Sequence, residues 1–251
     1  MSSDELYALT VQDVVKQAAD VVTITLRIAP EIRDQFHYLP GQYLMVRHPG
    51  GGEDEFRSYS ICQAPPAAGG GPETVRIAVR LLGPGGFGEF AHSKLSPGDT
   101  VDVLRPTGRF RLQPAARHIA TAAGSGITPV LAMAEAALLR GDEFSLVYGN
   151  RTEESTMFAD EIADLEVRFP DRFTVLHVLS RVPREHHRSG RIDAANLPAL
   201  LGATGWGATD EETHFYLCGP AGMVKDVRSF LTAAGVGRKR VHSELFSALV
   251  H

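Results

Sequence analysis

The sequence is poor in cysteine. Its two cysteines, Cys62 and Cys218, lie far apart in a chain of 251 residues. This spacing excludes a CxxC metal knuckle, a framework of disulfides and the four thiolates of an iron–sulfur cluster. We therefore expect two reduced thiols and no bound metal.

Long apolar runs and an excess of positive charge are also missing. No stretch approaches the roughly 18 apolar residues of a membrane span, and the N-terminal segment MSSDELYALTVQD lacks the cationic and apolar parts of an export signal. The formal net charge is −5 and the basic residues are scattered, which argues against nucleic-acid binding. The sequence predicts a cytoplasmic protein that binds neither membranes nor nucleic acid.

What the first part of the chain does contain is alternation. Six short segments with apolar residues at every second position are bounded by turn formers: ALTVQDVVKQ, VVTITLRIAP, GQYLMVRHP, FRSYSICQA, TVRIAVRLLG and DTVDVLRPTG. They predict a six-stranded antiparallel Greek-key β-barrel. One interruption, EFAHSKL at residues 89–95, has helical character.

The pattern changes after LQPAARH. Apolar runs such as HIATAAG, FSLVYGN, FTVLHVLSR and THFYLCGP now alternate with segments of helical periodicity such as ITPVLAMAEAALLRGD. This alternation predicts an α/β domain with a parallel sheet. We place the domain boundary near residues 112–117, which gives a barrel domain over 1–113 and an α/β domain over 114–251.

The junction AAGSGITP carries a signal for an anion site. Gly124 and Gly126 let the backbone approach a ligand closely, and the helix that follows offers free N–H groups to a phosphate. A plain strand–helix turn remains the alternative, because the full GxGxxG pattern is not present. YLCGPAGM repeats the arrangement with Cys218 and Gly219, where a packed, inert thiol is the alternative reading.

The segment RSYSIC interleaves a cation, a phenol and hydroxyls. Strand alternation places Arg57 and Tyr59 on one face and Ser60 on the other, so the strand must twist or end there for all three to reach one ligand. A guanidinium suits a diphosphate and a phenol suits the edge of a flat, partly polar ring.

RSYS, PTGRF, AAGSGITP, YGNR and CGP occur in an order that resembles the ferredoxin–NADP reductase superfamily of FAD-dependent reductases. The chain is most similar to the reductases that serve oxygenases, such as the phenylacetate and ketosteroid hydroxylase reductases. The resemblance implies a barrel that binds FAD and an α/β domain that binds a nicotinamide dinucleotide.

The same resemblance assigns the flavin site. It implies that Arg57 pairs with the FAD diphosphate, that Tyr59 lies along the flavin and that Ser60 hydrogen-bonds near the ring nitrogen that receives hydride. The main chain of Ala78, Val79 and Arg80 is implied to line the flavin ring, and the N–H groups of Gly86, Phe87 and Gly88 to meet the phosphates. The chain departs from its relatives at Gly88, where they usually carry Ser or Thr, and at Gln63.

In the second domain the resemblance implies that Gly124, Gly126 and Thr128 hold the dinucleotide. Cys218 and Gly219 are implied to border the reactive carbon, so that Ser60, Thr128 and Cys218 would act in hydride transfer. The resemblance implies that four residues bind the adenosine end of the dinucleotide: Ser180, Arg181, Arg151 and Arg191. No carboxylate lies beside Ser180, and this set of residues favours NADPH over NADH. His186 and His187 lie in a polar loop and are interpreted as solvated.

The electron acceptor must lie outside this sequence, since two cysteines cannot hold a [2Fe–2S] cluster. The chain is either a separate two-domain reductase or part of a longer one, and it would pass single electrons to a ferredoxin or an oxygenase component. Arg105, Arg109 and Arg111 are the first candidates for docking such a partner, and Arg238, Lys239 and Arg240 the second.

Phe246, near the end of the sequence, would cover the flavin face that the nicotinamide must reach, or would pack as an ordinary end-of-chain residue. Two other functions stay open at this point. The chain could be a reductase that releases free reduced flavin, or a non-catalytic module that senses a nucleotide within a larger complex.

Overall fold

The computed structural model describes residues 5–48, 55–66, 70–181, 188–206 and 212–246. Contacts divide the chain into two compact units, Met1–Arg111 and Leu112–His251. Each unit has its own hydrophobic core, and each is described separately below.

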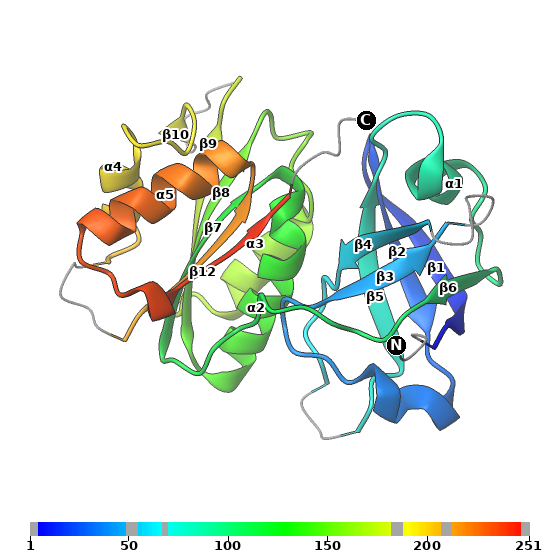
Figure 1. The fold of residues 1–251 in the computed structure, drawn as a ribbon. Helices are drawn as coiled ribbons and strands as arrows, with labels where there is room; N and C mark the ends of the chain where they lie inside the picture. Colours follow the sequence, from blue (N-terminus) through cyan, green and yellow to red (C-terminus); the bar gives the residue numbers. More distant parts are fainter. Residues whose placement is uncertain (1–4, 49–54, 67–69, 182–187, 207–211, 247–251) are drawn as a thin grey trace. The chain divides into compact units, whose positions relative to one another are not determined.

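The first unit is an antiparallel sheet of six strands in the order β4-β3-β6-β1-β2-β5 (Figure 1). The edge strands β4 and β5 are joined by an isolated bridge between Ile61 and Ile77, which curls the sheet into a barrel. The predicted six-stranded barrel is confirmed. Its strands are β1 (Tyr7–Ala18), β2 (Val21–Arg27), β3 (Tyr43–Arg47), β4 (Phe56–Ser60), β5 (Thr74–Arg80) and β6 (Thr100–Val103).

Alternation along the strands builds the barrel core. In β1 the side chains of Tyr7, Leu9 and Val11 are buried while Ala8 and Thr10 are exposed, as expected for a strand with one face on the core. Two short elements complete the unit, the 3-10 helix η1 (Pro30–Phe36) and the helix α1 (Gly86–Ser93). α1 begins three residues before the helical segment that the sequence predicts.

The second unit is a parallel sheet in the order β10-β9-β8-β7-β11-β12, with helices on both faces (Figure 1). This confirms the predicted α/β domain. Its strands are β7 (Arg117–Ala123), β8 (Glu143–Asn150), β9 (Phe173–Leu179), β10 (Arg188–Ser189), β11 (His214–Gly219) and β12 (Val241–Leu245).

The helices of this unit are α2 (Ile127–Arg140), α3 (Ala159–Arg168), α4 (Leu197–Gly202) and α5 (Ala221–Ala233), with 3-10 turns η2 (Gly124–Gly126) and η3 (Arg238–Arg240). α4 and α5 cover one face of the sheet and α2 and α3 the other (Figure 1). None of the helices in the described part of the chain combines the length and apolarity that a membrane crossing requires.

The order of these strands fixes where a ligand can bind. β7 is followed in the chain by β8 on one side, whereas β11, which comes later, pairs with β7 on the other side. The strand order therefore reverses at β7. In open parallel sheets the crevice beyond the carboxyl ends of the strands at such a reversal is the usual ligand site.

Candidate functional site

In the described part of the chain, β4 and β5 are paired at the bridge between Ile61 and Ile77 but not on one side of it. At the bridge the two strands are held together, since Cys62 N–H donates to Arg76 O at 2.9 Å. Towards Arg80 no ladder joins the two strands among the described residues. We name this unpaired stretch, between 57–60 of β4 and 78–80 of β5, the barrel seam.

β5 presents its main chain to the barrel seam at alternate residues. Val79 is paired with Val22 of β2, and Leu81 N–H donates to Asp20 O at 2.8 Å. Because hydrogen-bonded pairs alternate along an antiparallel ladder, the main-chain groups of Val79 face β2 and those of Ala78 and Arg80 face the seam. The Arg80 side chain is engaged elsewhere, in an ion pair with Asp20 at 3.1 Å. Ala78 and Arg80 thus offer main-chain groups to a ligand.

The side chains of β4 lie on the opposite side of the seam. β4 ends at Ser60, which is buried, while Tyr59 is partly buried with its ring 5.5 Å from that of Phe87. Burial raises the pKa of the Tyr59 phenol to about 12, so the hydroxyl keeps its proton and can donate a hydrogen bond. The neutral Tyr59 phenol and the unpaired main-chain groups of β5 could together bind a flat, partly polar ring.

Arg57 is already partly neutralised. Its guanidinium forms an ion pair with Glu55 at 3.0 Å and donates to Phe56 O at 3.1 Å, and about a third of its side chain is exposed. A fork of this kind binds a phosphate through two parallel hydrogen bonds. A ligand phosphate would compete with the Glu55 carboxylate for the same donors.

The start of α1 supplies a second set of donors. Gly85 and Gly86 have φ of 76° and 78°, a left-handed conformation that favours glycine, and the space beside each is open. Gly85 N–H donates to the Glu89 carboxylate at 2.6 Å, and no side chain caps the helix. The N–H groups of Gly86, Phe87 and Gly88 therefore remain for an anion. Together with Arg57, this donor set fits the diphosphate of FAD.

In the second unit the turn from β7 to α2 lies directly on the end of β11. A Cβ added to Gly126 would be 2.2 Å from Cys218 O, so only glycine fits there. Gly124 has φ of 54°. Thr128 is buried in the first turn of α2 and donates its hydroxyl proton to Ser125 O at 2.9 Å, which fixes the turn. The uncapped N-terminus of α2 at this turn fits the pyrophosphate of a nicotinamide dinucleotide.

Cys218 and Gly219 end β11 at the same edge. Cys218 is fully buried, and burial, with a smaller contribution from Glu244, raises its pKa well above the usual thiol value. Its sulfur is therefore a protonated thiol. Gly219 accepts a hydrogen bond from Phe246 N–H at 3.2 Å, which ties the chain after β12 to this edge.

Glu244 is a residue that the sequence reasoning missed. It lies on β12 in register with Cys218, its Oε2 is buried without a hydrogen-bond partner in the described structure, and burial raises its pKa to about 7. A carboxyl that exchanges its proton near neutrality lies beside the predicted reaction site. The signal in the sequence is slight, a lone Glu within the alternating segment VHSEL.

The ends of β8 and β9 bring the predicted adenosine-binding residues together. Ser180 N–H donates to Asn150 O and Arg181 N–H to Arg151 O, both at 3.0 Å, and the side chains of Arg151, Ser180 and Arg181 are exposed. Two guanidinium groups and a hydroxyl therefore lie at neighbouring strand ends.

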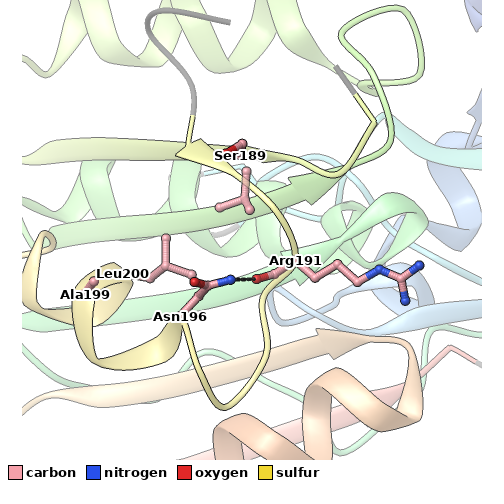
Figure 2. Close-up of a pocket in the computed structure, with 6 residues that line it drawn as sticks. Ser189, Arg191, Asn196, Ala199 and Leu200 are labelled. Atoms are coloured by element: carbon pink, nitrogen blue, oxygen red, sulfur yellow. Dashed lines mark hydrogen bonds between the residues drawn. The ribbon is translucent and has the colours of Figure 1, made fainter. Parts of the chain in front are cut away.

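Arg191 borders a pocket of about 230 Å³ in the same unit, lined by Val178, Ser189, Arg191, Asn196, Ala199 and Leu200. Figure 2 shows the Arg191 side chain extending away from Leu200 and Ala199, while Asn196 Nδ2 donates to Arg191 O at 3.0 Å. The Arg191 guanidinium can therefore contact groups outside this pocket.

The remaining predicted residues are dispersed. Arg105 and Arg109 are exposed, and Arg111 Nε donates to Gly108 O at 2.7 Å. Arg238 and Lys239 are exposed in η3, and Arg240 donates to Thr213 O at 3.4 Å. His186 and His187 lie outside the described residues, and the residues that are described contain no cluster of His, Cys, Asp and Glu able to hold a metal.

Comparison with known families matches both units. Residues 8–112 match an oxidoreductase FAD-binding domain, and residues 121–229 match an oxidoreductase NAD-binding domain. The FAD-binding match covers the barrel seam and α1, and the NAD-binding match covers the turn at Gly126, Cys218 and Gly219. The two cofactors that the donor sets fit are thus assigned to the two units.

Two curated relatives align with nearly the whole chain. It is 36% identical over 250 residues to a subunit of the 1,2-phenylacetyl-CoA epoxidase of Escherichia coli, covering 96% of this chain and 68% of that protein. It is 33% identical over 244 residues to the ferredoxin reductase component of 3-ketosteroid-9-alpha-monooxygenase of Rhodococcus rhodochrous, covering 96% of this chain and 65% of that protein. The chain thus spans about two thirds of each relative.

A solved structure shares the fold. The ferredoxin NADP+ reductase of Neisseria gonorrhoeae, with bound FAD and NADP, superposes with a TM-score of 0.79 at 22% identity, covering 96% of this chain and 98% of that one. Fold, domain matches and sequence identity agree. The chain therefore belongs to the family of ferredoxin reductase-type flavoprotein oxidoreductases, built from an FAD-binding and an NAD-binding domain, that includes both of these relatives.

Proposed function

We propose that this protein takes hydride from NADPH onto bound FAD and passes the electrons singly to a separate protein of an oxygenase system. The balance is NADPH and two oxidised one-electron acceptors giving NADP+, a proton and two reduced acceptors. The observation that carries the proposal is the identity of 36% with a component of an epoxidase over 96% of the chain, together with the two phosphate-binding donor sets.

FAD supplies the redox chemistry, because a flavin accepts two electrons together and releases them one at a time. The protein's part is to bind and orient. Arg57 and the N–H groups at the start of α1 would hold the diphosphate, and Tyr59 and the main chain of Ala78 and Arg80 would border the ring.

The second unit would hold the dinucleotide through the turn at Gly126 and through α2. The Cys218 thiol, which is fully buried in this structure, would have to be uncovered to border the nicotinamide ring, and it would then do so as an uncharged group. Glu244, with a pKa near 7, would hold or release a proton beside it, so that the charge at the site changes with pH near neutrality.

The first test is direct. Purified protein loaded with FAD is mixed with NADPH, and we expect the flavin absorbance to bleach within seconds and an added ferredoxin-type [2Fe–2S] protein to be reduced with a stoichiometry of two per NADPH. A protein that binds both nucleotides without bleaching would be a nucleotide-sensing module instead. Loss of the flavin on dialysis, with turnover only of added free flavin, would identify a flavin reductase.

The preference for NADPH is proposed from the exposed Ser180, Arg181 and Arg151 at the ends of β8 and β9. Arg181→Ala should raise the KM for NADPH about tenfold and change the KM for NADH less than twofold, because only NADPH carries the 2′-phosphate that the guanidinium pairs with. Lys225→Ala, an exposed cation on α5, is the matched control and should change neither. Equal effects of Arg181→Ala on both cofactors would contradict the preference.

The acceptor is proposed to be an acidic ferredoxin or an oxygenase component that docks near Arg105, Arg109 and Arg111. Two of these, Arg105 and Arg109, are exposed on the barrel unit. The double variant Arg105→Glu with Arg109→Glu should slow ferredoxin reduction at low salt, and the difference should shrink as salt rises. Reduction of the flavin by NADPH, which needs no acceptor, serves as the internal control.

A further inference from the structure

Helix α1 is seated on strand β5 through two residues one turn apart, Gly88 and His92. A Cβ added to Gly88 would lie 2.9 Å from Arg80 O, so the helix backbone touches the strand backbone there. His92 Nε2 lies 3.3 Å from Val79 O. Residues four apart lie on the same face of a helix, so both contacts belong to one face of α1. We name these two contacts the α1 seat.

The Gly88 contact cannot be relieved by a side-chain rotation, because its partner is a main-chain carbonyl within a strand paired to β2. In this structure a Cβ at this position would require α1 or β5 to shift. The glycine, where relatives usually carry Ser or Thr, thus allows the close approach of α1 to Arg80 in this chain.

The His92 contact completes the seat. Val79 is paired with Val22 in the ladder, and a carbonyl oxygen has two lone pairs, so Val79 O can also accept from His92 Nε2–H. Both the neutral Nε2–H form and the protonated ring carry a proton at Nε2. The contact is therefore available in either charge state of His92.

The α1 seat joins two parts of one candidate site. The start of α1 offers its N–H groups to phosphates, and Ala78 and Arg80 of β5 offer main-chain groups to the flavin ring. FAD must satisfy both at once, because its diphosphate and its ring belong to one molecule. Riboflavin, which has the ring but no phosphate, needs only the second.

We infer that Gly88 and His92 are positioning residues for FAD, which set the distance between the phosphate-binding end of α1 and the flavin-binding edge of β5. The inference rests on the proposed function. Neither side chain is required to touch the cofactor. Their effect should therefore appear as a loss of affinity for FAD that riboflavin does not share.

The test is a titration of flavin-free protein with FAD and, separately, with riboflavin. Binding is monitored through the quenching of flavin fluorescence. His92→Leu removes the donor and should raise the Kd for FAD about tenfold, the size expected for the loss of one hydrogen bond. The Kd for riboflavin should change less than twofold. His92→Gln, whose amide nitrogen can reach the same carbonyl, should restore FAD binding to within about threefold of the original protein.

Gly88→Ala should give the same pattern with a larger loss of FAD affinity, since its Cβ meets a backbone atom. Gly222→Ala in α5 is the matched control, because nothing lies within 4 Å of the added Cβ, and it should leave both Kd values unchanged. If His92→Leu does not fold, His92→Asn, whose polar side chain is too short to reach Val79 O, takes its place and should behave as predicted for His92→Leu.

Two results would overturn the inference. One is an equal loss of affinity for FAD and riboflavin, which indicates general damage to the barrel. The other is a His92→Gln variant as weak as His92→Leu, which indicates that the imidazole acts in another way. These results differ from failure of the proposed function, in which the original protein itself would bind no FAD or would not be reduced by NADPH.

Discussion

The glycines before and at the start of α1 in the barrel unit and Gly126 in the α/β unit are required for different physical reasons. In the barrel unit, Gly83, Gly85 and Gly86 have positive φ and open space around them, so they shape a loop whose surface stays accessible. In the α/β unit, Gly126 has ordinary backbone angles, with φ −62° and ψ −10°, but no room for a Cβ. Gly85 and Gly86 are thus needed for the conformational freedom of glycine, whereas Gly126 is needed for its small size.

The predicted ligand-binding arginines Arg57 and Arg181 also differ in how they are held. Arg57 and Arg80 of the barrel are ion-paired with Glu55 and Asp20. Arg181 of the α/β unit is exposed, and no ion pair is seen for it within the described ranges. A phosphate at Arg57 competes with the Glu55 carboxylate, whereas a ligand at Arg181 competes with water. Phosphate binding should therefore be more sensitive to neighbouring residues in the barrel.

The largest effect is expected from Gly126→Ala, which adds a Cβ at a position that has no room for one. Its Cβ would be 2.2 Å from Cys218 O, and neither backbone can move without disturbing the sheet. We expect a loss of about 3 kcal/mol or more in the free energy of unfolding, at the upper end of overpacking effects, together with loss of dinucleotide binding. Thermal and urea unfolding measure the first, and NADP+ titration measures the second.

Two alanine variants serve as its controls. Gly222→Ala has open space in a helix and should stabilise the protein slightly. Gly85→Ala has open space but φ of 76° and ψ of 165°, and should cost about 1–3 kcal/mol because the strain is conformational. If Gly85→Ala proved as damaging as Gly126→Ala, the contrast between conformation and size would be wrong.

The next largest effect is expected from Arg57→Ala, which removes the ion-paired arginine of the barrel unit. Loss of a charge-assisted fork to the diphosphate should raise the Kd for FAD about 10- to 100-fold, measured by titration of flavin-free protein. Glu55→Gln removes the competing carboxylate and should shift the Kd in the opposite direction, by a smaller factor. An Arg57→Ala protein that retains full flavin occupancy through dialysis would remove this residue from the site.

The smallest effect is expected from Glu244→Gln and appears as a change in pH dependence. Burial raises the folded-state pKa of this carboxyl to about 7, above its unfolded value, so the folded state holds the proton more tightly. Its stabilising contribution is complete below the unfolded pKa and is lost as pH rises through about 7. The melting temperature of the original protein should fall more steeply between pH 4.5 and 7 than that of Glu244→Gln, and the two slopes should agree above about pH 8.

The pH range for this variant follows from the ordinary and the raised pKa of Glu244, and its neighbours are controlled for by comparison. Burial, and to a lesser extent His214, lowers the pKa of His242 on the same strand to about 4, so its stabilising contribution is lost as pH falls below 6.5, but His242 is present in both proteins and its effect cancels in the comparison. Asp160→Asn, which removes an exposed carboxylate on α3, should leave the slope between pH 4.5 and 7 unchanged. Parallel slopes for Glu244→Gln and the original protein would show that Glu244 does not titrate in this range.

Local patterns predicted the architecture well. The alternation of β1 and β5 and the strand–helix alternation after Arg117 correspond to the barrel and the parallel sheet. β12 was not predicted, because VHSEL is short, follows a basic turn and is stabilised as a strand by its pairing with β11. The roles assigned to individual residues by family resemblance, such as Ser60 and Thr128, remain predictions.

The sequence by itself determined the two-domain fold and the glycine-rich phosphate loops, because periodicity and backbone freedom are properties of neighbouring residues. Only the tertiary structure decided that Glu244 lies in register with Cys218, that Glu55 neutralises Arg57 and that α1 touches β5 at Gly88. Two of these contacts join separate segments through strand register and close backbone packing. The third depends on which rotamer brings a carboxylate to a nearby guanidinium, and no local pattern in the sequence encodes any of them.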